Sequence, residues 1–240
     1  MENDICIWDR TLKAAMKVPL VKVNREEFLL KELGKYCNDE NIGIAILHPP
    51  TILSKKQIDA VAKDCIQYHL TVVCSVSALS GLPGCWFMMA TLPADIVQFY
   101  YHILVLAQKL AYLYGFPDFS NEKGDFDDKS MQILTVFIGV MMGANIAINN
   151  IEKLAVAFGC QVAKRLPREA LTQYATYNVT KEIAKWIGIK LTKETFAKGC
   201  GKIIPLIGAP ISYAVTYYTF KPMANKLKKH LNENIKWTES

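Results

Sequence analysis

Charged residues are missing from three long stretches of this 240-residue sequence. Residues 70–94, 130–151 and 203–220 contain no Asp, Glu, Lys or Arg, and hydrophobic residues make up 51% of the chain. That apolar share lies at the top of the range for soluble domains. The first stretch is long enough to span a bilayer, but a Gly-Leu-Pro-Gly segment at 81–84 interrupts it. We therefore expect a helical hairpin there and not a single spanning helix.

The short motifs of common enzyme and metal sites are also missing. The seven cysteines are scattered without a C-x-x-C pair, which argues against structural zinc. No G-x-S-x-G nucleophile elbow occurs. The Gly-Cys-Gly-Lys segment at 199–202 lacks the Ser or Thr of a phosphate loop, and the acidic loop at 118–129 lacks EF-hand spacing. We expect no cofactor and no bound metal.

Signals for export and for nucleic-acid binding are absent as well. The first ten residues, MENDICIWDR, lack the basic region and the apolar run of a signal peptide. We therefore expect the protein to be cytoplasmic, and peripheral to or inserted at the inner membrane. No zinc-finger spacing, helix-turn-helix or RNA-binding motif is present, so nucleic acid is not an expected partner.

Positive charge is concentrated toward the C-terminus. Residues 152–240 contain 15 Lys and Arg against 6 Asp and Glu, a net charge of +9, whereas residues 1–151 have a net charge of −3. A basic half next to apolar segments indicates contact with an anionic lipid surface or an acidic partner. The expected partners are anionic lipid headgroups or an apolar ligand, with a membrane protein as a further candidate.

Helical periodicity predicts an all-α fold, a multi-helix bundle with apolar central hairpins. Two amphipathic helices near 3–17 and 25–37 form an N-terminal unit over 1–48, and the second has Asn24 as its N-cap with Glu27 at capping-box spacing. The remaining residues, 49–240, form the main helical domain; one domain over 1–240 is the alternative. Further helices are expected after Ser54, over 93–114, near 166–186 and 192–200, and in the basic C-terminal tail.

Two glycine- or proline-containing stretches carry further expectations. Gly139 and Gly143 have a G-x-x-x-G spacing, which predicts a close helix packing face, with membrane dimerisation as the alternative. Pro205, Gly208 and Pro210 are expected to break the third uncharged stretch.

Three sequence blocks resemble the EcsC family of bacterial proteins. The blocks are SALSGLPGCWFMMATLPADI with the downstream LAYLYGFPD, then IGVMMGAN, then KIIPLIGAPISYAVTYY, and their order agrees over residues 25–230. The resemblance implies a largely helical, hydrophobic bacterial protein, and the founding member of the family is encoded beside an ABC transporter. It implies no catalytic residues.

Asp95 and His102 are the weak candidates for catalysis. They are seven residues apart in the helix expected over 93–114, so both side chains can share a face. Asp95 also fits a structural role, because an acidic residue in the first turn stabilises a helix N-terminus. His102 and His69, at the edges of apolar segments, also fit hydrogen-bonded core histidines.

A second set of residues is predicted to contact lipid. The tail has an apolar side formed by Met223, Leu227, Leu231 and Ile235, and it carries several lysines. The predicted lipid-contacting residues are Lys221, Lys226, Lys228, Lys229, Leu82, Trp86 and Phe87. A solvated basic face is the alternative for the lysines.

Three functions remain open from the sequence. The first is a membrane-associated, non-enzymatic protein at the cytoplasmic face of the bacterial membrane, associated with a transporter or acting as a membrane-inserting effector. The second is a soluble module that binds an apolar or lipid ligand between its helices. The third is a hydrolase that uses Asp95 and His102.

Overall fold

The chain is all-α, as predicted. The computed structural model describes residues 10–80, 94–120, 126–159, 178–183, 185 and 205–235. Its helices are α2 (Arg25–Leu33), α3 (Ile42–Leu47), the short 3-10 helix η1 (Pro49–Thr51), α4 (Lys55–Ser80), α5 (Ala94–Leu113), α6 (Asp128–Met142), α7 (Asn145–Gly159) and α9 (Pro205–Glu233). Residues 10–16 and 178–183 are helical too.

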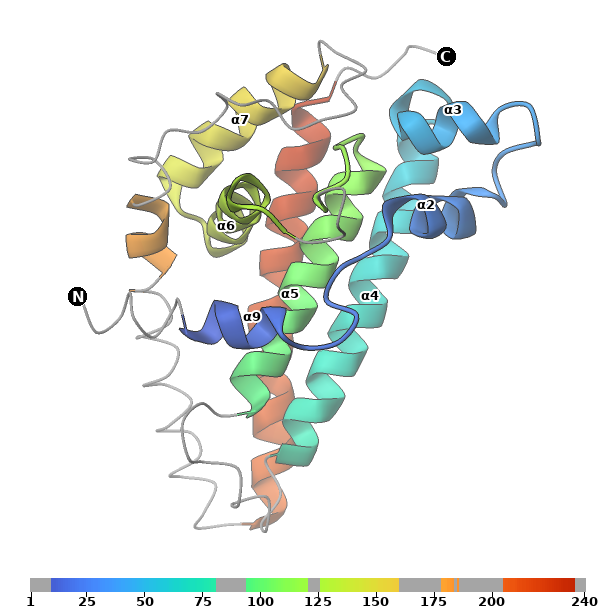
Figure 1. Cartoon of the computed structure of the whole chain (residues 1–240). Helices are drawn as coiled ribbons and strands as arrows, with labels where there is room; N and C mark the ends of the chain where they lie inside the picture. Colours follow the sequence, from blue (N-terminus) through green and yellow to red (C-terminus); the bar gives the residue numbers. More distant parts are fainter. Residues whose placement is uncertain are drawn as a thin grey trace.

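Three long helices, α4, α5 and α9, form the central bundle (Figure 1). The helices α6 and α7 pack against α9 at one end of this bundle, and α2 packs on α5 from another side. The remaining length of α4, α5 and α9 extends beyond the other described helices, toward the bottom of Figure 1. Among the described helices, one end of the bundle is therefore surrounded by others and the other end is not.

Hydrogen bonds fix an antiparallel register in the bundle. Asn232 of α9 donates to Asp59 of α4 at 2.9 Å, and Thr216 of α9 donates to Ser77 of α4 at 2.9 Å. Tyr114, just after α5, donates to the same Asp59 at 3.1 Å. Because an α-helix rises about 1.5 Å per residue, heights along the bundle can be counted from these pairs.

Local capping explains where two helices begin. Asn24 accepts a hydrogen bond from the Glu27 backbone N–H at 3.1 Å, which confirms the predicted N-cap. Ser54 and Gln57 cap each other before α4, since the Ser54 N–H donates to Oε1 of Gln57 at 2.9 Å and the Gln57 N–H donates to the Ser54 hydroxyl at 3.4 Å. The predicted start of α4 after Ser54 is therefore confirmed.

α4 and α9 are longer than predicted. α4 continues from its amphipathic first half through the uncharged residues to Ser80. α9 runs without interruption through Pro210 and Pro222, so the predicted breaks in this stretch were wrong. An internal proline removes a helix hydrogen bond and costs about 3 kcal/mol in an unsupported helix. Packing of α9 against α4, α5 and α6 offsets that cost.

Gly139 and Gly143 lie at a close contact inside the chain. A Cβ on Gly139 would lie 2.6 Å from Val179 and 2.7 Å from Ala147, so the helices here leave no room for a side chain. Gly143 has φ +83 and ends α6 in the left-handed conformation that favours glycine. The predicted packing face is confirmed, and its partners belong to the same chain.

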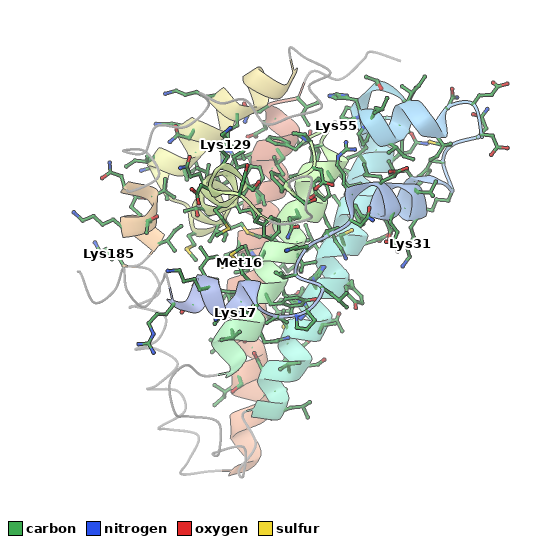
Figure 2. The ribbon with its side chains drawn as sticks, in the orientation of Figure 1. Met16, Lys17, Lys31, Lys55, Lys129 and Lys185 are labelled. Atoms are coloured by element: carbon green, nitrogen blue, oxygen red, sulfur yellow. The ribbon has the colours of Figure 1, made fainter. Side chains whose placement is uncertain are left out.

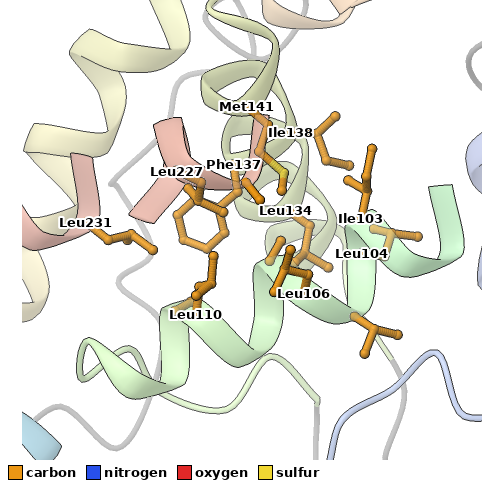
Figure 3. Packing of buried hydrophobic residues seen from close by; sticks show 14 of the residues in the cluster. Ile103, Leu104, Leu106, Leu110, Leu134, Phe137, Ile138, Met141, Leu227 and Leu231 are labelled. Carbon is orange, nitrogen blue, oxygen red and sulfur yellow. The ribbon is translucent and has the colours of Figure 1, made fainter. Parts of the chain in front are cut away.

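The hydrophobic core lies where α5, α6 and α9 meet (Figure 3). α5 contributes Leu104 and Leu110, α6 contributes Phe137, and α9 contributes Leu227 and Leu231, and all five are at most 1% exposed. Almost every side of α5 is buried, which agrees with its apolar sequence.

The N-terminal residues are bonded to the bundle across the predicted boundary at residue 48. Gln108 of α5 accepts from the Val23 N–H at 3.1 Å and donates to the Val21 carbonyl at 2.8 Å. Arg25 donates to the Phe116 carbonyl at 2.9 Å, after the end of α5. These contacts favour one domain over two. The helices predicted near 166–186 and 192–200 lie largely outside the described residues.

Candidate functional site

One end of the bundle carries almost no charge. The segments 65–80 of α4, 96–108 of α5 and 205–220 of α9 contain no Asp, Glu, Lys or Arg. The antiparallel register brings these segments together, at the end that extends beyond the other described helices (Figure 1). We call the three segments the uncharged end. Charged residues flank the segments directly: Asp64 precedes the α4 segment, Asp95 and Lys109 border the α5 segment, and Lys221 follows the α9 segment.

Large apolar side chains are exposed at the uncharged end. Leu79 is 61% exposed, Tyr213 is 41% exposed and Tyr218 is 76% exposed. Tyr213 stacks on Tyr217, which meets Tyr218 edge to face. Single exposed apolar residues are common on soluble proteins, whereas a group of them marks an interaction surface. The predicted lipid-contacting residues Leu82, Trp86 and Phe87 lie outside the described residues.

Two of the four C-terminal lysines face other helices of the same chain. Lys228 lies 3.7 Å from the carboxylate of Asp59, and its side chain is 16% exposed. The Lys226 ammonium lies against Gly143 at the C-terminus of α6, where the helix dipole favours a cation. Both lysines therefore have a role within the fold.

Lys226 is nevertheless exposed, as are the other two lysines, Lys221 and Lys229. Lys229 lies 3.7 Å from Glu233, one turn further along α9. Lys221 donates to the Tyr217 hydroxyl and lies over the Tyr217 ring. Lipid contact by these lysines stays a prediction, but the four do not share one basic face.

The apolar side of the C-terminal tail belongs to the core. Met223 is 5% exposed, Leu227 is 0% exposed and Leu231 is 1% exposed, while Ile235 packs against them as a partly buried neighbour. A helix that buries its apolar side in its own protein does not offer that side to a membrane. The sequence pattern alone does not distinguish these two destinations.

Two buried histidines meet between α4 and α5. Nδ1 of His69 lies 2.8 Å from Nδ1 of His102, and Nζ of Lys109 lies 3.3 Å from Nε2 of His69. Because an ammonium group only donates, Nε2 of His69 accepts and its Nδ1 carries the proton. His69 therefore donates to His102, which keeps its own proton on Nε2. Both rings are neutral in this arrangement.

The surroundings hold both imidazoles neutral. Burial, followed by the charge of Lys109 and by His102, lowers the pKa of His69 to about 3. Burial and Lys109 lower the pKa of His102 to about 4. In the part of the chain that the structure describes, no group of three His, Cys, Asp or Glu side chains could hold a metal ion. The pair acts as a polar link between two helices.

The catalytic pairing of Asp95 with His102 stays a prediction. Asp95 lies in the first turn of α5, but its side chain is outside the described residues. The partner that the structure gives to His102 is His69. The sequence identified both histidines as separate core candidates, but it gave no register between α4 and α5 and therefore no pairing.

Sequence reasoning missed a basic segment near the N-terminus. Residues 10–25 contain five basic residues and no acidic residue, and Arg10, Lys13 and Lys17 are exposed. Residues 1–151 as a whole have a net charge of −3, and this total concealed the local excess of basic residues. A count over a window of one or two helices would have found it.

No protein-family model, curated protein or solved structure matches the chain. The geometry of the bundle and its two ends is therefore what supports a function.

Proposed function

We propose that the protein is a membrane-associated helical protein that places the uncharged end of α4, α5 and α9 in one leaflet of the cytoplasmic membrane. The observation that carries the proposal is the set of three adjoining segments without a charged side chain, 65–80, 96–108 and 205–220. A surface of this kind is costly in water and favourable in lipid.

The part of the uncharged end that extends beyond the histidine pair fits a single leaflet, whereas the α4 segment 65–80 as a whole rises about 22 Å. From His69 to the end of α4 at Ser80 there are 11 residues, which rise about 16 Å along the bundle axis. The hydrocarbon core of a bilayer is about 30 Å thick, so one leaflet is about 15 Å. Among the described residues, no helix is both long enough and apolar enough to cross a membrane.

The polar groups near the uncharged end suit an interface. Tyr68, next to His69 on α4, is 61% exposed, and Tyr101, next to His102 on α5, is partly exposed. Tyrosine is enriched at membrane interfaces because its ring is apolar and its hydroxyl is polar. Thr216, closer to the end of the bundle, donates its hydroxyl proton to the Ser77 hydroxyl, so that this donor is satisfied without water.

The test is co-sedimentation of detergent-free protein with phosphatidylcholine vesicles, with and without phosphatidylserine, followed by a high-salt wash. Binding that resists the wash is expected, because salt screens charges but does not weaken apolar contacts. Binding that salt removes completely would reduce the role to electrostatic attachment. A protein that stays in the supernatant with both vesicles would refute the proposal and favour the soluble module for an apolar ligand.

The resemblance to the EcsC family is compatible with this proposal, because it implies a hydrophobic helical protein, and the founding member of the family is encoded beside an ABC transporter. Membership of that family, bacterial origin and association with a transporter are further proposals of the same standing. Each would be tested by recovering the protein from membranes and identifying what is bound to it.

A further inference from the structure

The segment 10–20 has three exposed cations and one exposed leucine. Arg10, Lys13 and Lys17 are exposed, while Leu12 and Ala15 on the same short helix are buried in the core. The helix is therefore fixed to the protein by its apolar side, and its basic side faces outward. We call Arg10, Lys13, Lys17 and Leu20 the N-terminal patch.

Leu20 has an unusual conformation for an exposed leucine. Its φ is 65, in the left-handed region. Among the described residues, the others with a positive φ are glycines. A leucine there is strained, since its Cβ crowds the backbone. Leu20 is also 84% exposed, the highest value among the exposed large hydrophobic residues of the described chain. Neither burial nor backbone preference accounts for a leucine at this position.

The N-terminal patch lies beside the uncharged end. Gln108 holds the backbone at Val21 and Val23 against α5. From there the chain leads to helix 10–16, which crosses the bundle near the middle of its length, and the uncharged end extends below this crossing (Figure 1). Figure 2 shows Met16 and Lys17 at the crossing and Lys55 near the top, at the end of the bundle away from the uncharged end.

We propose that the N-terminal patch is a binding site for anionic lipid headgroups, in which Arg10, Lys13 and Lys17 contact the headgroups and Leu20 enters the membrane interface. The proposal rests on the membrane function proposed above, because the patch reaches a bilayer only when the uncharged end is inserted. Cations next to an exposed apolar side chain are the combination that anionic membrane surfaces bind.

The first test compares two triple variants with the same change in charge. Arg10→Gln, Lys13→Gln and Lys17→Gln remove the cations of the patch, and Lys55→Gln, Lys56→Gln and Lys63→Gln remove three exposed cations of α4 outside it. Partitioning is measured on vesicles of phosphatidylcholine alone and of phosphatidylcholine with phosphatidylserine. The patch variant should bind the anionic vesicles roughly fivefold more weakly per charge removed. The α4 variant should keep most of the wild-type preference for anionic vesicles.

The second test is Leu20→Gly. Glycine adopts a positive φ without strain, so this variant should be at least as heat-stable as the wild type. Its binding to both kinds of vesicle should fall about tenfold, since the apolar anchor is lost. A purely structural role for Leu20 would leave vesicle binding unchanged.

The outcomes separate this inference from the proposed function. Equal loss in the two triple variants, equal wild-type binding to both vesicles, or unchanged binding of Leu20→Gly would overturn the N-terminal patch while leaving the uncharged end intact as a membrane contact. A wild-type protein that binds neither vesicle would overturn both proposals.

Discussion

The two ends of the central bundle consist of the same three helices but are linked by different chemistry. At one end, Asp59 accepts hydrogen bonds from Tyr114 and Asn232 and lies 3.7 Å from Lys228. At the uncharged end, the link between α4 and α9 is the neutral pair Thr216 and Ser77. We call the first the charged end.

The difference shows which environment each end suits. When an ion pair is buried, both charges lose their hydration. The pair is then stable only where nearby water or several hydrogen bonds compensate for this loss. Two neutral hydroxyl groups joined by a hydrogen bond have far less hydration to lose. The charged end therefore suits water, and the uncharged end suits lipid. Changes to single residues at each end should expose this contrast.

Acid should weaken the link between α4 and α5 where the two ends meet. His69 and His102 have lowered pKa values of about 3 and about 4 when folded, against 6.5 for an ordinary histidine. The unfolded chain thus binds more protons below pH 6.5, and stability falls as the pH falls. Between pH 7 and pH 5 the free energy of unfolding should drop by about 2 kcal/mol for each histidine.

Urea unfolding at several pH values measures this drop. The variant His102→Gln keeps an acceptor for the His69 N–H but has one histidine fewer, so its pH slope should be smaller by about one proton. If the wild type and this variant had the same slope between pH 5 and pH 6, the histidine pair would not be the source of the acid sensitivity.

Removing Arg25 should destabilise the charged end. Its guanidinium donates to the carbonyls of Phe116 at 2.9 Å, Ile46 at 2.6 Å and Leu47 at 3.0 Å. Arg25→Ala leaves carbonyls at the end of α3 without this partner, and the free energy of unfolding should fall by about 3 kcal/mol. Arg25→Lys keeps the charge without the planar fork and should recover less than half. Thermal unfolding of the wild type, Arg25→Ala and Arg25→Lys measures these differences in stability. A loss below about 0.5 kcal/mol for Arg25→Ala would contradict the prediction.

Local sequence signals predicted much of the fold. The cap at Asn24, the start of α4 after Ser54 and the packing at Gly139 all follow from residues within a few positions of one another. The apolar sequence of 93–114 also predicted α5, which is helical over Ala94–Leu113. These features are local, so one sequence is enough to predict them.

What the sequence did not predict depends on residues far apart in the chain. Lys228 was expected to face lipid, but it lies beside Asp59. Asp59 also accepts a hydrogen bond from Asn232, which is 173 residues away in the sequence. The helix α9 continues through Pro210, in the part of α9 that lies along the distant helix α4. His69 and His102 meet only because α4 and α5 take one particular register.

A charge introduced at the uncharged end should abolish much of the membrane binding. Leu79→Glu places a carboxylate where the side chain is 61% exposed, so folding should be little affected. Partitioning into phosphatidylcholine vesicles should fall at least about tenfold, because charged groups are costly inside a bilayer. The matched control is Leu30→Glu, which is 52% exposed and, like Leu79, in the last turn of its helix. If both variants bound like the wild type, the uncharged end would not be the inserted surface.

Neutralising Asp95 should have the opposite effect. Asp95 is the one charged residue in the sequence between Asp64 and Lys109, and it lies in the first turn of α5 at the uncharged end. Asp95→Asn should strengthen vesicle binding severalfold at neutral pH, because an ionised carboxylate opposes insertion. The gain should disappear in acid, where the wild-type carboxylate is protonated. Weaker binding of Asp95→Asn at every pH would show instead that the carboxylate contributes to the contact.

The smallest expected effect concerns the neutral link at the uncharged end. Thr216 is 6% exposed, and its hydroxyl donates to Ser77 at 2.9 Å. Thr216→Val keeps the shape and removes the donor, which should cost about 1 kcal/mol of stability in water, as for a typical neutral hydrogen bond. In vesicles the cost should be larger, because the Thr216–Ser77 hydrogen bond is stronger where water is excluded. Thermal unfolding with and without vesicles measures both values. A cost that vesicles leave unchanged would mean that Ser77 stays in contact with water, and that the uncharged end does not enter the bilayer to this depth.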